Sequence, residues 1–328
     1  MSTDERVLAT TTSELPRLGS GGPPPAKRVP FRALRDKLVD LWLARELLRQ
    51  LVGKELKVRY KNSALGFLWS LLTPALMTVV FTVIFQYVIR IQVLDFAAFF
   101  LSGYLVWQFF QNSAQGSVGA IVGNGALIKK VYFPREVLPL SIVLSQVVHL
   151  VLALVAVSPY LIWSRGWSIV LHLPAILIGI LLVTVFTAGV SMLLAGANVP
   201  FRDLQELIVV IFMVWFYATP IIYPIAMVTG SDTAAGAVFG HILNANPMTW
   251  FVKLFRESIY GSVVSNPRCA EFATVNPSDP CPYRPFLTEP QSWPSPELLL
   301  GCTLAAGIAF ALGYLAFHRF AVNFAKEV

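Results

Sequence analysis

The chain has 328 residues, of which 56% are hydrophobic and only 13% are charged. Because soluble domains carry about 25% charged residues, this composition indicates an integral membrane protein rather than a soluble domain. The formal net charge of +7 would suit a nucleic-acid partner, but the basic residues lie beside hydrophobic segments, most of them near the N-terminus. That placement argues against nucleic-acid binding.

Residues 1–38 have a composition typical of disorder. They contain the runs TTTS and GSGGPPPAKR, are poor in apolar residues and rich in Gly and Pro. They also lack the hydrophobic core of a signal peptide. We therefore expect a disordered cytoplasmic tail over this range.

Residues 39–62 have the pattern of an amphipathic helix. Their apolar residues recur at helical spacing, namely Leu41, Ala44, Leu48, Leu51 and Val52. Arg45, Arg49 and Lys57 fall toward another face. Such a helix lies in the interface plane of a membrane with its basic residues toward anionic headgroups. The alternative is an ordinary positive flank that only sets the topology.

Residues 63–328 contain six apolar segments, and a span needs about 20 apolar residues to cross a hydrocarbon core of about 30 Å. The segments are 65–89, 97–121, 138–163, 173–196, 207–228 and 298–318. The expected fold is an all-α membrane protein with six transmembrane helices. Of the 25 Lys and Arg residues, 19 lie on the side that carries both termini. The positive-inside rule places that side in the cytoplasm.

Residues 124–137, NGALIKKVYFPREV, form a charged elbow between the second and third segments. Its charged, aromatic and proline residues are Lys129, Lys130, Tyr132, Phe133, Pro134, Arg135 and Glu136. Pro134 is expected to end a short helix before the chain returns to the membrane. A plain positive loop with a proline turn is the alternative reading.

Residues 229–297 lie on the outer side and are not one featureless loop. Asn246 is a candidate N-cap with Pro247 at the first helical position. The apolar stripe that follows consists of Phe251, Leu254, Phe255 and Ile259. This helix, 247–260, is too short to span, so we expect an external or re-entrant helix. A Pro-rich loop follows, in which Cys269 and Cys281 are able to pair in an oxidising compartment.

Several kinds of chemistry are absent from the pattern. None of the 18 acidic residues falls within the six segments, which disfavours an ion-coupled transporter. No CxxC or His/Cys cluster indicates a metal site, and no catalytic set can be assembled. The only GK pair, Gly53-Lys54, has Leu48 where a phosphate-binding loop needs Gly. If ATP drives this protein, another chain binds it.

Four stretches resemble the permease subunit of ABC exporters from the polysaccharide and polyol-phosphate export family, which includes O-antigen, teichoic-acid and galactan exporters. They are RELLRQLVGKELKVRYKNSALGFLWSLLTPAL, NGALIKKVYFPREVLPLS, ANVPFRDLQEL and NPMTWFVKLFRESIYG. They lie in the family's order, from about residue 40 to the end. The tail and the cysteine-bearing loop point, within the family, toward an actinobacterial galactan exporter.

The resemblance implies a homodimer in the bacterial cytoplasmic membrane, with two ATP-binding cassette subunits that carry ATP and Mg. This chain itself would hold no cofactor and would not be an enzyme. The substrate would be a glycan on a polyprenyl diphosphate lipid. The elbow, with Lys129, Lys130, Tyr132, Phe133, Pro134, Arg135 and Glu136, would be a coupling helix that docks into the ATPase.

The resemblance also suggests roles for two further groups of residues. Cations near the headgroups would bind the lipid diphosphate, namely Arg45, Arg49, Lys54, Lys57 and Arg59; bulk anionic lipid is the alternative ligand. Aromatic residues would contact the sugar in the channel, namely Trp69, Tyr104, Trp107, Trp215, Tyr217 and Tyr223. An interfacial aromatic belt is the alternative for the latter.

Two other functions stay open at this point. A permease that exports a drug or a small lipid would share the fold. A membrane enzyme acting on lipid-linked sugars would need an outer carboxylate, and the candidates Asp232, Glu257, Glu271 and Asp279 have no useful spacing.

Overall fold

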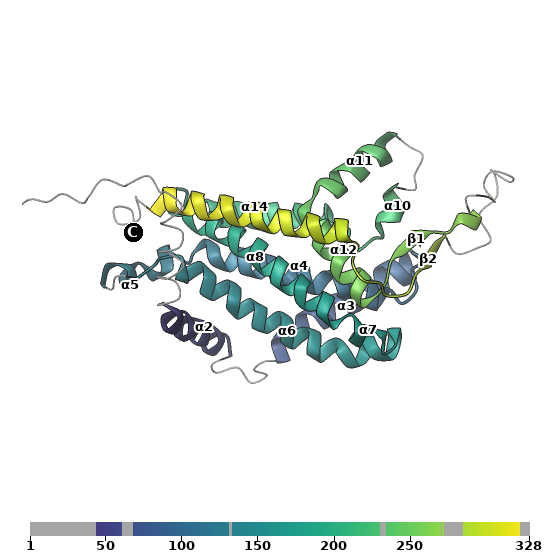
Figure 1. Cartoon of the computed structure of the whole chain (residues 1–328), viewed down its shortest axis with the longest axis horizontal. Helices are drawn as coiled ribbons and strands as arrows, with labels where there is room; N and C mark the ends of the chain where they lie inside the picture. The colour runs from purple at the N-terminus through teal and green to yellow at the C-terminus, as the bar shows by residue number, and fades with distance from the viewer. Residues whose placement is uncertain are drawn as a thin grey trace, which may run out of the picture. The chain divides into compact units, whose positions relative to one another are not determined.

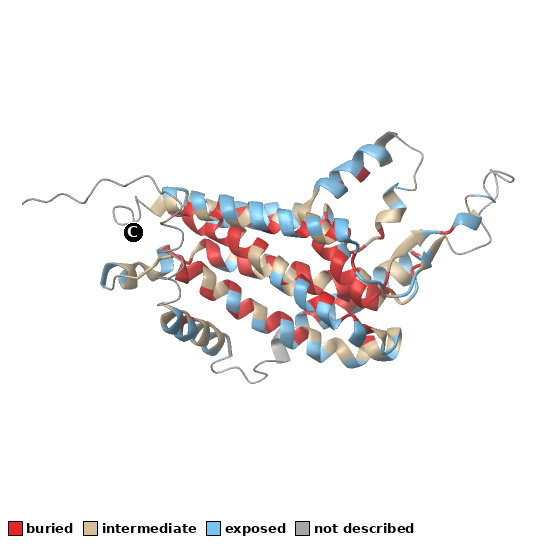
Figure 2. Cartoon of the chain, viewed as in Figure 1, coloured by how far each residue is buried: buried red, intermediate tan, exposed pale blue. Residues whose placement is uncertain are grey.

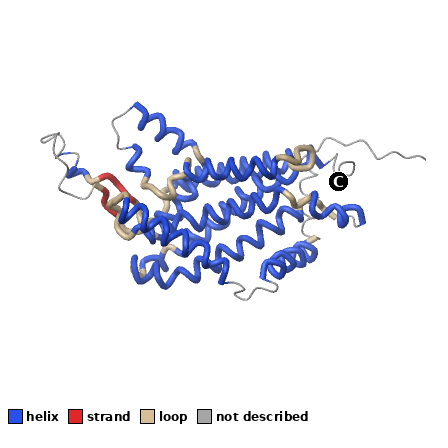
Figure 3. The backbone as a smooth tube through the Cα atoms, turned by 180° about the vertical axis from the view of Figure 1, so that it is seen from behind, coloured by secondary structure: helices blue, strands red, loops and turns tan. Residues whose placement is uncertain are grey.

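The computed structural model describes residues 44–60, 68–130, 133–229, 234–269, 271 and 285–321. The predicted tail, residues 1–38, lies outside the described residues. Within them the chain is mostly helical, as expected, with one short sheet. Figure 1 shows the longer helices side by side along the bundle, and Figure 3 shows the same arrangement from behind.

Helix α4 (Phe96–Val118) is the centre of the bundle. It contacts α3 (Leu68–Thr82), α6 (Val137–Arg165), α8 (Leu173–Ala197), α9 (Leu204–Tyr217) and α12 (Pro247–Ile259). Most of its side chains are buried, and Figure 2 shows the buried residues gathered in the middle of the bundle. A helix that is buried on most of its faces belongs in such a position.

Helices α8 and α14 (Pro296–Ala321) make the most extensive contact between two elements. A Cβ atom added to Gly313 would overlap the carbonyl oxygen of Gly189, and one added to Gly189 would overlap the backbone of Ala309. The two backbones therefore touch, which only small residues permit. The small residues of the last segment serve packing within the chain at this point.

Four helical stretches of the described residues are long and apolar enough to cross a membrane: 71–88, α6, α8 and α14. The first joins α3 to the π-helix η1 (Val83–Val88). Helix α4 has 23 residues, but the glutamines and asparagine in its second half make it less apolar. Six crossings therefore stay a prediction.

The fifth expected segment, 207–228, is not one continuous helix. Helix α9 has 14 residues and ends at Tyr217, and a short helix α10 (Ile225–Thr229) begins after an irregular stretch. Pro220 and Pro224 lack the N–H that a continuing helix would use, so the helix ends before them. By itself α9 is too short to cross a bilayer.

The outer segment contains α11 (Ala234–Ala245) and α12, followed by strands β1 (Val263–Ser265) and β2 (Phe286–Thr288). The strands pair antiparallel, with Val263 opposite Thr288. This ribbon is an addition to the otherwise helical fold that the sequence did not predict. Three-residue strands show too little alternation to be recognised from sequence.

The remaining elements lie at the two ends of the bundle. Helices α2 (Arg45–Tyr60) and α5 (Gly125–Lys130) lie toward the end of the bundle at which α14 ends (Figure 1), and the 3-10 helix η2 (Val122–Asn124) directly precedes α5. Helix α7 (Ser168–Leu171) follows α6 at the opposite end. We call the first the elbow end, made of α2, η2, α5, residues 133–136 and the last turns of α14. The other is the α12 end, made of the 89–95 turn, the end of α6, α7, α10, α12, β1 and β2.

Candidate functional site

The predicted elbow forms a short helix with exposed cations. Lys129 and Lys130 are the last residues of α5, where positive charge is favoured by the helix dipole, and both are exposed. Phe133 and Pro134 are half-buried, and Tyr132 lies outside the described residues. The exposed lysines are thus placed to contact another molecule.

The second half of the elbow is attached to α14. Glu136 is only 7% exposed, and its Oε1 lies 2.9 Å from Nε2 of His318. Arg135 Nη1 donates a hydrogen bond of 2.9 Å to the carbonyl oxygen of Ala321. We expected both residues at the rim of a docking surface, but Glu136 is buried against α14. For Glu136 this corrects the expectation.

The predicted amphipathic helix is present as α2. Its apolar stripe includes Leu51, which is buried, and the helix packs against α6. Four of the expected phosphate-binding residues are exposed on it, namely Arg45, Arg49, Lys54 and Lys57. The side chain of Arg59 lies outside the described residues. The position of α2 relative to a membrane stays a prediction.

The expected channel aromatics are found in three different environments. Trp107 has no exposed surface and packs edge-on against Phe110 and Phe212. This corrects its assignment to the channel, because no part of it is left to contact a solute. Tyr217 is 54% exposed. Tyr104, Trp215 and Tyr223 are half-buried, and the side chain of Trp69 lies outside the described residues.

Asn246 joins the end of α9 to the start of α12. Its Oδ1 accepts hydrogen bonds from the Met248 backbone N–H (3.0 Å) and from Nε1 of Trp215 (2.9 Å). Its Nδ2 donates to the carbonyl of Ala218 and to Oγ1 of Thr219, both at 2.9 Å. The predicted N-cap is confirmed, and the same side chain also fixes the break after α9.

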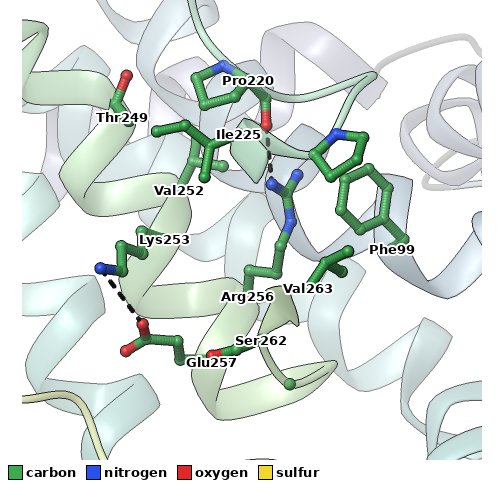
Figure 4. Close-up of a pocket in the computed structure, with 12 residues that line it drawn as sticks. Phe99, Pro220, Ile225, Thr249, Val252, Lys253, Arg256, Glu257, Ser262 and Val263 are labelled. Atoms are coloured by element: carbon green, nitrogen blue, oxygen red, sulfur yellow. Dashed lines mark hydrogen bonds and ion pairs between the residues drawn. The ribbon is translucent and has the colours of Figure 1, made fainter. Parts of the chain in front are cut away.

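Arg256 is the buried cation of the α12 end, and the sequence reasoning assigned it no role. It is 8% exposed, and its Nη1 and Nη2 donate to the carbonyls of Pro220 (2.8 Å) and Ile221 (3.1 Å). Its Cζ lies 3.8 Å from the ring centroid of Phe99. Figure 4 shows the side chain rising from α12 toward Pro220. The sequence signal that could have indicated this role is a basic residue within an otherwise apolar stripe of the helix.

The charge of Arg256 is held by backbone and ring rather than by a carboxylate. Burial lowers the pKa of Arg256 to about 9, so the guanidinium stays charged at neutral pH. The planar fork bonds two carbonyls while its face stacks on Phe99, an arrangement that Lys cannot reproduce. Arg256 therefore ties the irregular stretch after α9 to both α12 and α4.

A second network ties the 89–95 turn to α6. Asp95, in a left-handed conformation (φ 48°), caps α4 at Ala98 and accepts from Tyr160 (2.7 Å) and Ser164. Arg165 donates from Nη2 to the carbonyl of Tyr260 at 2.6 Å. These contacts join α4, α6 and α12, so the α12 end is braced by polar side chains.

A small cavity of about 80 Å³ lies beside Arg256 (Figure 4). Its walls are mainly apolar and include Phe99, Pro220 and Val252. Lys253 Nζ lies 3.7 Å from Glu257 Oε1 at this site, and burial raises the pKa of Glu257. The cavity is too small for a nucleotide. Among the described residues no group of His, Cys, Asp or Glu is arranged to hold a metal ion.

The cysteines have different states. Cys269 takes part in a disulfide bond, whereas its expected partner Cys281 lies outside the described residues, so the pairing stays a prediction. Cys302 is a free thiol buried in α14.

Comparison with known proteins gives a family. Residues 46–260 match the family described as ABC-2 type transporter. This range begins in α2 and ends just after α12, so it includes α5 and α12 but not β1, β2 or α14.

Curated relatives match most of their own length. The O-antigen export system permease protein RfbA of Myxococcus xanthus is 36% identical over 225 residues, which are 67% of this chain and 83% of that protein. Its namesake from Klebsiella pneumoniae is 34% identical over 215 residues, or 65% and 79%. The polysialic acid transport protein KpsM of Escherichia coli is 24% identical over 219 residues, or 65% and 80%.

Proposed function

The chain belongs to the ABC-2 type transporter family, and we propose that it is the permease of an ATP-driven exporter that moves a polysaccharide across the cytoplasmic membrane of a bacterium. The observation that carries the proposal is the 36% identity to a protein named as an O-antigen export permease, over 83% of that protein's length. The four long apolar helices support it. The cargo is proposed to be a glycan on a polyprenyl diphosphate lipid.

The proposal assigns ATP hydrolysis, and with it ATP and Mg, to a separate subunit present in two copies. The phosphate-binding loop is missing from this sequence, and the exposed lysines of α5 suit a partner with complementary charge. We therefore assign Lys129, Lys130 and Phe133 to the docking surface for that subunit. The excess of Lys and Arg on that side supports a cytoplasmic location for the elbow end and both termini.

The proposed path for the glycan lies between two copies of the chain. Helix α9 has only two buried residues, Ile208 and Phe212, and its other faces are free to contact lipid or a second copy. Exposed Tyr217 and half-buried Tyr104 offer ring faces that stack on sugar C–H groups. The exposed cations of α2 would attract the lipid diphosphate from the cytoplasmic leaflet.

The experiment that tests the function is depletion of the chain in its native cell. Surface polysaccharide is measured together with lipid-linked glycan extracted from the membrane. We expect surface glycan to fall while lipid-linked glycan accumulates in a form that an external glycosidase reaches only after the cells are opened.

Two outcomes would contradict the proposal. Loss of the glycan without an accumulated precursor would favour an enzyme of glycan synthesis. Unchanged surface glycan, with new sensitivity to small amphiphiles, would favour export of a drug or small lipid.

A further inference from the structure

The contacts between the elbow and α14 join parts of the chain that are far apart in sequence. Arg135 donates to the carbonyl of Ala321 across 186 residues, and Glu136 contacts His318 on the previous turn of α14. The ring of Tyr314 lies edge-on to that of His318 at 4.3 Å between centroids. Two adjacent residues of the elbow are thus fixed to the last two turns of one helix.

The Glu136–His318 contact is stronger than an ordinary surface ion pair. Glu136 is buried, so water and salt screen the contact little. A neutral imidazole can donate from Nε2 just as a charged one does, so the 2.9 Å contact is a hydrogen bond to a carboxylate in either state. Surface pairs, by contrast, contribute little.

Helix α14 is a stiff connection from this contact to the α12 end. Its backbone touches that of α8 at Gly313 and Gly189, so the two helices are packed in direct contact. Farther along, Gly301 lies beneath the ring of Trp250, the side chain of α12 that faces it. Helix α14 also contacts α12 directly. We therefore expect a displacement of the last turns of α14 to displace α12 as well.

We propose that Glu136 and His318 are positioning residues that fasten the elbow to α14, so that movement imposed on the elbow by the ATPase reaches the α12 end. The inference rests on the proposed function, which makes the elbow the docking site. Glu136 directly precedes the first residue of α6, and the pair therefore makes α6 and α14 respond as one body. Without the pair, the elbow would move while α14 and the attached α12 lag behind.

The test uses the full exporter, with its ATP-binding subunit, in cells and as purified complex. Two variants, Glu136→Gln and the double variant Glu136→Cys/His318→Cys, are compared with wild type. The control is Glu297→Gln, which changes an exposed glutamate in the first turn of α14. A reducible bifunctional thiol reagent then joins the two introduced cysteines. Three quantities are measured: the amount of ATPase subunit that co-purifies, ATP hydrolysis, and exported glycan per ATP hydrolysed.

We expect the cysteine pair to bind the ATPase subunit and hydrolyse ATP while export per ATP falls at least about tenfold, as the loss of a buried charged hydrogen bond implies. Cross-linking should restore export, and reduction should abolish it again. A role confined to folding would not be switched on and off in this way. Glu136→Gln, which keeps the size of the side chain, should show a smaller loss, and Glu297→Gln should match wild type.

The contrary outcomes are distinct. Unchanged export per ATP in the cysteine pair, or no recovery after cross-linking, would overturn the inference. Loss of the ATPase subunit from the variants alone would assign Glu136 to docking and would also overturn it. Absence of an ATPase subunit from the wild-type complex would instead contradict the proposed function. If the cysteine pair does not accumulate in the membrane, the same ratio measured on Glu136→Gln decides.

Discussion

The two ends of the bundle use cations in opposite ways. At the elbow end Lys129 and Lys130 stand exposed on the last turn of a six-residue helix. At the α12 end Arg256 is buried under Phe99 and bonds two carbonyls of one irregular stretch. We propose that the exposed cations serve a partner, whereas the buried one holds the fold together.

The cost of removing a cation depends on its burial and its hydrogen-bond partners, and not on residue type alone. The buried guanidinium of Arg256 donates to two carbonyls, so its removal leaves them unpaired and costs stability. An exposed ammonium is already solvated by water, so its removal costs almost nothing until a partner is present. We therefore expect substitutions of the buried cation to destabilise the fold, and substitutions of the exposed cations to weaken only the binding of the partner subunit.

The largest loss of stability is expected from Arg256→Leu. It orphans the carbonyls of Pro220 and Ile221 and releases the stretch between α9 and α10, at a cost of about 3 kcal/mol or more in free energy of unfolding. Unfolding of the purified protein in mixed SDS micelles measures it. Arg256→Lys should recover only part, because one ammonium cannot bond both carbonyls and stack on Phe99. A neutral result would mean that the α12 end does not depend on this cation.

The next largest loss of stability is expected from a change in helix α14, which runs between the two ends. Gly313→Ala puts a methyl group into the backbone of Gly189, and such overpacking costs about 1–3 kcal/mol. Gly307→Ala is the matched control on the same helix, since a Cβ there meets nothing within 4 Å. The two variants are compared by thermal unfolding in detergent. Equal unfolding temperatures would contradict the close packing of α8 and α14.

A smaller effect is expected from the cap of α12. Asn246→Ala removes an N-cap, which costs about 1 kcal/mol, and also breaks the bonds to Trp215, Ala218 and Thr219. Asn246→Asp keeps both acceptor bonds and loses only the two donated ones, so its unfolding midpoint should lie between those of Asn246→Ala and wild type. If Asn246→Asp were as unstable as Asn246→Ala, the donated bonds rather than the cap would hold the junction.

The smallest change in stability is expected at the elbow. Lys129→Ala/Lys130→Ala should alter the free energy of unfolding by less than about 0.5 kcal/mol, while binding of the ATPase subunit weakens. Titration of the purified variant with that subunit, at low and high salt, measures the loss. The wild type should lose affinity at high salt and the variant should not. A marked loss of stability would contradict the division of roles between the two ends.

Local signals in the sequence predicted local structure well. The Asn246-Pro247 start and the apolar stripe of α12 are in place, with Phe251, Leu254 and Phe255 fully buried. Helix α2 (Arg45–Tyr60) lies within the predicted range 39–62, and α5 lies within the predicted elbow. Caps and helical periodicity are encoded within a few residues, so they can be read without the fold.

Contacts between distant residues could not be predicted. Nothing near Glu136 in the sequence indicates His318, and nothing near Arg256 indicates the carbonyl of Pro220. Trp107 was misassigned for a related reason. Its neighbours in sequence do not show that Phe212 covers it, so an aromatic residue of the core looked the same as one facing a channel. The break after α9 does have a local signal, since Pro220 and Pro224 follow the helix within a few residues.

The measurement that tests the account most directly is co-purification of the chain from its native membrane, as wild type and as Lys129→Ala/Lys130→Ala/Phe133→Ala. We predict that an ATP-binding cassette subunit accompanies the wild type, and that the variant, equally stable, loses it and stops exporting glycan. If no such subunit accompanies the wild type, or if the variant retains both the subunit and export, the elbow is not the coupling site and the proposed exporter is contradicted at its base.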